Sequence, residues 1–310
     1  MVKTKRTKNR NSILRLLLRN RMYLGGIGIV LFFSIVALLA PVIAPTPPEQ
    51  FVGGANIAPS TEFWFGTTAL GKDVFSQTVW GARNSLIIGF GTSIVATIAA
   101  LLVGMTAGYF GGVVDDVLTL IMNIFLVIPG LPLLIVLSGY LNPGTTTVIF
   151  VLALTGWAFA ARIVRSQVLS LRSKDFVAAA KVSGESTFRI IFVEIMPNMA
   201  SIIVGLMVGA VSYGIAAATA LSFLGLTDIS AVTWGTNLYW AQNGNALLVG
   251  AWWTFVPSGL SVALVIFGLA LINYAMDEVT NPRLRAEKEV RNVIKSQSSG
   301  DVLVTPVVRS

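Results

Sequence analysis

The residues best placed to do chemistry lie in one polar segment, 172–198, which follows a long apolar region. The segment is expected to form two short helices. Gly184 lies between them, at the C′ position where a glycine commonly ends a helix. Four apolar side chains follow at i, i+3, i+4 and i+7, the spacing of one helical face: Phe188, Ile191, Phe192 and Ile195. Such a face must bury itself, either on the underside of its own chain or in a groove of a partner. In the second case, its chemistry is recognition of another protein.

Covalent catalysis is disfavoured by the residue types present. The chain contains neither histidine nor cysteine, which excludes disulfides, thiol nucleophiles, zinc sites and histidine acid–base catalysis within it. It also lacks a Gly-x-x-x-x-Gly-Lys-Ser/Thr phosphate-binding motif. We therefore expect a chain that is not an enzyme and carries no cofactor or metal of its own, so that any energy for work comes from partners.

The composition is that of a membrane protein. Of the 310 residues, 55% are hydrophobic and 12% are charged, against about 25% charged in a soluble domain. The mean hydropathy is +0.78, which excludes a soluble globular enzyme and a disordered chain. Since a spanning helix needs about 20 apolar residues, the long charge-free intervals predict an all-α integral membrane fold with six transmembrane helices, at 23–44, 85–109, 117–140, 146–165, 198–224 and 252–274.

These helices predict the organisation of the chain and its orientation. Twenty of the 22 lysines and arginines fall in three segments that share one side of a six-helix topology, and only Lys72 and Arg83 fall on the other. The positive-inside rule then predicts a multi-pass protein of the plasma or inner membrane with both termini in the cytoplasm. The predicted parts are a basic segment 1–22, a first transmembrane helix 23–44, an extracytoplasmic loop 45–84, a core 85–279 that includes a cytoplasmic loop at 172–196, and a cytoplasmic tail 280–310.

Glycine pairs at four-residue spacing occur in two of the predicted helices. Gly104 and Gly108 lie in the second, and Gly205 and Gly209 lie in the fifth. Such pairs allow close helix packing. The alternative is a helix that lines a cavity and slides against its neighbours.

The cytoplasmic loop carries a motif. It resembles the "EAA" loop of ABC importer permeases, which reads Glu-Ala-Ala, three residues, Gly, and a Leu-Pro ending thirteen residues later. Ala179, Ala180, Gly184 and Pro197 match at the right spacing, whereas Ala178 and Met196 stand at the Glu and Leu positions.

Further stretches narrow the family to the oligopeptide/dipeptide (peptide/nickel) permeases. Residues 65–76 (FGTTALGKDVFS) and 80–86 (WGARNSL) resemble its GTD-x-x-GRD-x-x-S and GAR-x-SL stretch, with Thr68 and Lys72 in place of Asp and Arg. Residues 221–226 (LSFLGL), Trp234-Gly235 and the ending NPRLR at 281–285 are similar to the same family, so the resemblance covers about residues 12–285.

The resemblance implies a type I ABC importer permease fold and a subunit that forms half of a solute pathway. The implied partners are a second homologous permease subunit, two cytoplasmic ATPases that hold ATP and Mg, and an extracytoplasmic substrate-binding protein, beside membrane lipids and with no nucleic acid. The residues expected to couple the chain to the ATPases are Ala179, Ala180, Lys181, Gly184, Glu185, Phe188, Arg189, Ile191 and Pro197. Those expected at an outer gate or receptor seat are Asp73, Arg83, Trp234 and Trp240.

The solute is less narrowly predicted. Short peptides are the default for the resembling family, and oligosaccharides or nickel are carried by some of its members. The tryptophans of segment 227–253 could stack on sugars, although an aromatic belt at the membrane interface explains them more simply. Outside this class, the alternatives are a membrane scaffold subunit that transports nothing and an intramembrane enzyme.

Overall fold

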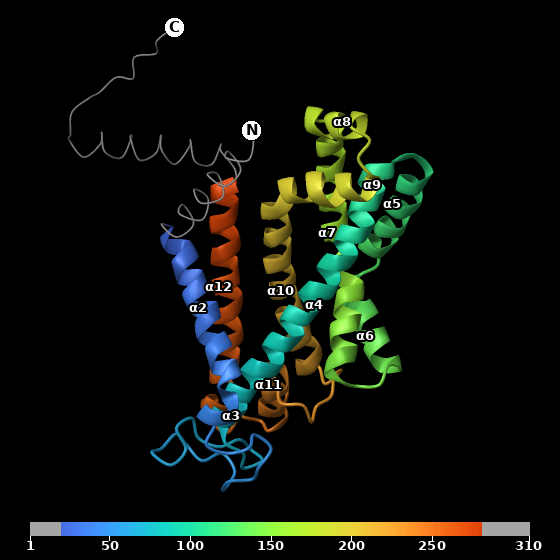
Figure 1. The fold of residues 1–310 in the computed structure, drawn as a ribbon. Coiled ribbons are helices and arrows are strands. Elements are labelled where there is room, and N and C mark those ends of the chain that lie inside the picture. Colours follow the sequence, from blue (N-terminus) through green and yellow to red (C-terminus); the bar gives the residue numbers. More distant parts are fainter. Residues whose placement is uncertain (1–19, 281–310) are drawn as a thin grey trace, which may run out of the picture.

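The computed structural model describes residues 20–280, and this part of the chain is a bundle of helices (Figure 1). Its regular β-pairing is limited, within these residues, to two isolated bridges in the loop that precedes α4. The elements run in the order α2 Arg21–Leu38, α3 Ala40–Ile43, α4 Val74–Phe110, α5 Gly112–Val127, α6 Gly130–Tyr140, α7 Thr145–Arg172, α8 Asp175–Val182, α9 Thr187–Arg189, a π-helical turn Ile190–Ile195, a 3-10 turn Met196–Met199, α10 Ala200–Phe223, α11 Trp234–Asn243, a 3-10 turn Trp252–Thr254 and α12 Val256–Thr280.

Five helices in the described part are long and apolar enough to cross a membrane, which confirms an all-α membrane fold but not the count of six. The third expected helix, 117–140, is not continuous: it is divided into α5 and α6 at Ile128-Pro129. Proline lacks an N–H and pushes the residue before it into extended backbone, and Ile128 has φ −67° and ψ 125°. In Figure 1, α5 and α6 follow one another along the height of the bundle.

The second expected helix, 85–109, begins 11 residues too late. α4 starts at Val74, so the preceding loop ends at Asp73 rather than at residue 84. The Asp73 carboxylate caps the helix by accepting a hydrogen bond from the backbone N–H of Ser76 at 2.8 Å. With 37 residues, α4 is about 55 Å long, and Figure 1 shows it running obliquely across the bundle.

Close helix crossings hold the bundle together. A Cβ added to Gly104 of α4 would lie 2.5 Å from the carbonyl oxygen of Ala161 in α7, and one added to Gly108 would lie 2.8 Å from the Cβ of Val168. The packing interpretation of this glycine pair is therefore confirmed. It does not hold for Gly209 of α10, where an added Cβ would meet nothing within 4 Å.

The predicted basic segment at the N-terminus and the tail lie outside the described residues, apart from Asn20, Arg21, Met22 and Thr280. The basic residues at the two ends on which the predicted orientation depends are therefore not described, except for Arg21. The orientation stays a prediction.

Candidate functional site

The segment between α7 and α10 folds as two short helical pieces joined at Gly184, as predicted. Gly184 has φ +73°, and it ends α8 in a Schellman motif: its N–H donates to Lys181 O at 3.0 Å, and the N–H of Glu185 donates to Ala180 O at 3.1 Å. A Cβ at Gly184 would meet nothing within 4 Å. A side chain there would therefore cost backbone strain of about 1–2 kcal/mol without a clash.

The second piece begins where the sequence predicts but is not a regular α-helix. Ser186 caps α9, since its hydroxyl oxygen accepts from the N–H of Arg189 at 3.3 Å. After three α-helical residues the chain continues as a π-helical turn and then a 3-10 turn that contains Pro197. Changes of helical winding rotate the side chains relative to a simple i, i+3, i+4, i+7 face.

The apolar side chains of the segment are consequently shared between its own bundle and its outer surface. Ile191, expected on the partner-facing surface, is only 8% exposed, and Ile190 and Ile195 are also buried. They pack with residues of α4, α7 and α8 in one cluster whose buried members include Met105, Val164, Val168, Val177 and Met199. Ile191 is thus held by its own chain and does not belong to a free surface.

Several apolar side chains of the segment stay exposed, with the most exposed of them on either side of Gly184. Val182 is 90% exposed and Phe188 is 70% exposed, with the Phe188 ring 4.5 Å from that of Phe192. We call Val182 and Phe188 the exposed apolar pair. Most of the other residues expected here are exposed: Ala179, Lys181, Arg189 and Pro197, while Ala180 and Glu185 are partly exposed.

The charged side chains of the segment already have contacts within the chain. Arg189 forms an ion pair with Glu185, with Nε 2.8 Å from the carboxylate, and the Lys181 ammonium lies 5.5 Å from the centre of the Tyr109 ring at the end of α4. Both contacts are exposed and contribute little to stability. The ion pair lies within the second piece, and the Lys181 contact joins α8 to the end of α4.

Two arginines of α7 anchor the neighbouring helices beside this segment, a feature that the sequence analysis missed. The Arg165 guanidinium donates to both carboxylate oxygens of Asp115 in α5. Its Nε donates to Oδ1, and its Nη2 donates to Oδ2 at 2.6 Å. Arg172 donates to the carbonyl oxygens of Gly108 and Tyr109, 3.1 and 3.2 Å away at the end of α4. The basic residues that signalled topology thus also tie α4 and α5 to α7.

Removing one partner of this ion pair should destabilise the bundle. The side chains of Arg165 and Asp115 are 26% and 13% exposed, so we expect Arg165→Ala to cost about 1–3 kcal/mol, less than for a fully buried pair. The exchange of both residues, Asp115→Arg with Arg165→Asp, should recover part of this loss. Thermal unfolding of the purified protein checks both, with Arg162→Ala, an exposed arginine of the same helix, as the control. Equal melting temperatures for Arg165→Ala and Arg162→Ala would contradict the expectation.

The residues expected at an outer gate have mostly structural positions. Asp73 is 4% exposed and caps α4, while Trp234 is completely buried, with its indole N–H donating to Thr78 O at 3.1 Å. Asn237 of α11 also donates to the start of α4, at Gln77 O. Asp73 and Trp234 therefore join the start of α4 to its loop and to α11, and they are not part of an open surface.

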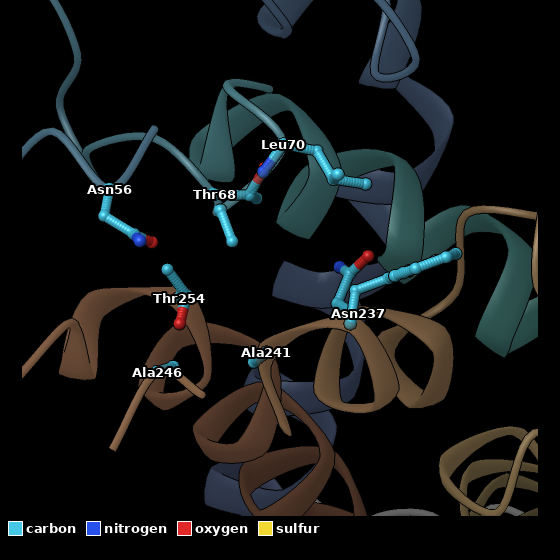
Figure 2. A pocket seen from close by; sticks show the side chains of 9 residues that line it. Asn56, Thr68, Leu70, Asn237, Ala241, Ala246 and Thr254 are labelled. Carbon is cyan, nitrogen blue, oxygen red and sulfur yellow. The ribbon is translucent and has the colours of Figure 1, made fainter. Parts of the chain in front are cut away.

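Arg83 and Trp240 keep exposed surface. The Arg83 guanidinium lies 5.4 Å from the centre of the Trp80 ring and makes no ion pair with Asp73 among the interactions of the described residues. Trp240 donates to Ile229 O at 3.0 Å and borders the small pocket of Figure 2. That pocket lies between the loop before α4 and the region of α11, and its lining residues are Asn56, Thr68, Ala69, Leu70, Asn237, Trp240, Ala241, Ala246 and Thr254.

Two protein families and several known proteins match the sequence of this chain. The family described as "Binding-protein-dependent transport system inner membrane component" matches residues 100–286, and the "N-terminal TM domain of oligopeptide transport permease C" matches residues 11–59. The dipeptide transport system permease protein DppC of Bacillus subtilis is 34% identical over 274 residues, which are 87% of this chain and 85% of the relative. The oligopeptide transport system permease protein OppC of the same organism is 32% identical over 269 residues, 86% of this chain and 87% of the relative. The di/tripeptide transport system permease protein DppC of Pseudomonas aeruginosa is 31% identical over 275 residues, 86% of this chain and 89% of the relative.

Proposed function

Since the chain belongs to the family of binding-protein-dependent transport system inner membrane components, we propose that it is a permease subunit of an ATP-binding-cassette importer for short peptides. It would form half of the solute pathway and couple ATP hydrolysis by partner subunits to uptake. The observation that carries this proposal is the similarity to dipeptide, di/tripeptide and oligopeptide permeases over more than four fifths of both chains. Neither the oligosaccharide and nickel alternatives nor a scaffold subunit is favoured by these relatives.

The proposed subunit crosses the membrane six times. α5 and α6 together hold 27 helical residues, or about 40 Å of helix, which is enough for one further crossing of a core about 30 Å thick. With the N-terminus inside, the segment that contains α8 and α9 lies in the cytoplasm. The assembly would contain a second homologous permease subunit, two ATPases and an extracytoplasmic substrate-binding protein.

The exposed apolar pair gives the proposed coupling its contact surface. Val182 and Phe188 are exposed on a segment whose isoleucines, Ile190, Ile191 and Ile195, are buried in the bundle. An ATPase that binds them would therefore move against a rigid attachment, and ATP with Mg would be held on that partner. Arg83 and Trp240 stay candidates for the seat of the substrate-binding protein, whereas Asp73 and Trp234 do not.

Uptake by the reconstituted complex tests this function. The chain, purified with its partner permease and ATPases and supplied with its substrate-binding protein, should import radiolabelled alanine peptides of two to five residues into ATP-loaded vesicles. Uptake should stop when ATP is replaced by a non-hydrolysable analogue. Import of maltotriose or Ni²⁺ without import of any alanine peptide would contradict the peptide assignment.

A further inference from the structure

A polar pair lies in the middle of two spanning helices, at Thr155 of α7 and Tyr213 of α10. Their hydroxyl oxygens are 2.9 Å apart. Thr155 is ten residues from the start of α7 and Tyr213 is ten residues from the end of α10. Both are therefore about 15 Å from the helix ends that the proposed topology places outside. That depth is about half of a bilayer core.

The direction of the hydrogen bonds in this pair follows from the neighbouring carbonyls. The Thr155 hydroxyl lies 3.2 Å from Val151 O and 3.1 Å from Leu152 O. Carbonyl oxygens only accept, so the single hydroxyl hydrogen of Thr155 points to its own helix, and Tyr213 donates to Thr155. The Tyr213 oxygen then keeps lone pairs that no described donor uses, which makes it a hydrogen-bond acceptor.

The side chain of Tyr213 is positioned with its ring against α7 and part of its surface open. A Cβ on Gly156 would lie 2.9 Å from Cε1 of the ring, so only glycine leaves room for it there. Tyr213 is 36% exposed, and a Cβ added to Gly209, one turn earlier on α10, would meet no atom of residues 20–280 within 4 Å. A hydroxyl oxygen with unused lone pairs is more stable against a polar medium than against hydrocarbon. This face of α10 should therefore meet a polar medium.

We propose that Tyr213 lines the solute pathway and that its oxygen accepts hydrogen bonds from the backbone N–H groups of the passing peptide. Each residue of a peptide other than proline brings one such donor. The inference rests on the proposed function and adds to it a residue that contacts the substrate, with Thr155 and Gly156 as positioning residues.

Removal of the single oxygen tests the contact. In the reconstituted complex, Tyr213→Phe should lower the maximal uptake rate of trialanine, or of whichever alanine peptide the wild type imports fastest, several-fold. Tyr140→Phe is the matched control, since Tyr140 is 87% exposed at the end of α6. Uptake by Tyr213→Phe equal to that of this control would overturn the proposal.

A cysteine probe tests the location independently of the rate. Because the chain contains no cysteine, Tyr213→Cys gives this subunit a single thiol. A charged methanethiosulfonate reagent should modify it, and turnover with trialanine and the substrate-binding protein should change the rate of modification. Phe267→Cys is the control, at a residue 56% exposed in the middle of α12. If the thiol at 213 were as unreactive as the thiol at 267, this face would lie against lipid or another subunit, and the proposal would be overturned.

The same measurements distinguish a failure of the proposed function from a failure of the Tyr213 contact. A wild-type complex that imports no peptide would overturn the proposed function and this inference together. A wild-type complex that imports peptides, with variants at 213 that behave as their controls, would overturn the inference alone.

Discussion

The substitution Phe188→Asp is expected to abolish uptake while the membrane bundle stays folded. Phe188 is 70% exposed, and its ring contact is with Phe192 of the same segment. The change therefore removes little from the fold but puts a charge on the surface proposed to enter the ATPase. If Phe188 is a principal anchor, its loss should cost at least about 2 kcal/mol of binding, or roughly a 30-fold weaker association.

Co-purification of the ATPases with the permease and ATP-driven uptake measure this effect. Ser173→Asp adds the same charge at an exposed position of the same segment, where the side chain bonds only to Ser170 O among the described interactions. This control should assemble and transport normally. Normal ATPase association and normal uptake in Phe188→Asp would rule out the exposed apolar pair as the coupling contact.

The largest effect on stability is expected from Gly104→Val, at the crossing of α4 and α7. An added Cβ would lie 2.5 Å from the Ala161 carbonyl oxygen and 2.8 Å from the Cβ of Val164. Backbone on the facing helix cannot move aside as a flexible side chain can, so the two helices must separate. Overpacking of this kind costs about 1–3 kcal/mol or more.

Gly28→Val on α2 is the matched control, because an added Cβ there would meet nothing within 4 Å. Thermal unfolding in detergent should show a lower melting temperature for Gly104→Val and little change for Gly28→Val. If the two variants melted together, the close approach of α4 and α7 would not be a determinant of stability.

Sequence patterns were most informative where one local rule decides the structure. The turn at Gly184 follows from the preference of a helix end for glycine at positive φ, and the Ser186 cap follows from its hydroxyl. The contact of Gly104 with α7 follows from the spacing of small residues. Each of these features depends on a few neighbouring residues.

The predictions were wrong where contacts between residues far apart in the sequence determine the structure. The charge of Arg83 suggested that the second helix begins after it, but Asp73 caps the helix and α11 covers its polar first turns. Regular α-helical spacing put Ile191 on one face with Phe188, and it was expected to contact the ATPase. The π-helical turn changes that spacing, and Ile191 is buried in its own chain. Trp234 is an aromatic residue in a predicted outer segment, and nothing in that pattern distinguishes an interface tryptophan from one buried among α2, α4, α10 and α12.

The Arg165–Asp115 pair also lay beyond the reach of the sequence patterns. The two residues are 50 positions apart on different helices. Both were visible as charges at the edges of apolar runs, but only the packing of α5 on α7 brings them together. A basic residue at the end of an apolar run can therefore form an ion pair with a neighbouring helix as well as indicate the topology.

The uninterrupted length of α4 has a mechanical consequence. Near its start, the Thr78 carbonyl oxygen accepts a hydrogen bond from Trp234 of α11. Near its other end, Met105 packs with the π-helical turn Ile190–Ile195 and the Gly108 carbonyl oxygen accepts a hydrogen bond from Arg172. A helix of about 55 Å without a break behaves as a lever, so that a tilt of about 5° around its midpoint displaces both ends by roughly 2 Å in opposite directions. Events on the two sides of the membrane would then share one rigid rod and need no chain of intermediate contacts to exchange a signal.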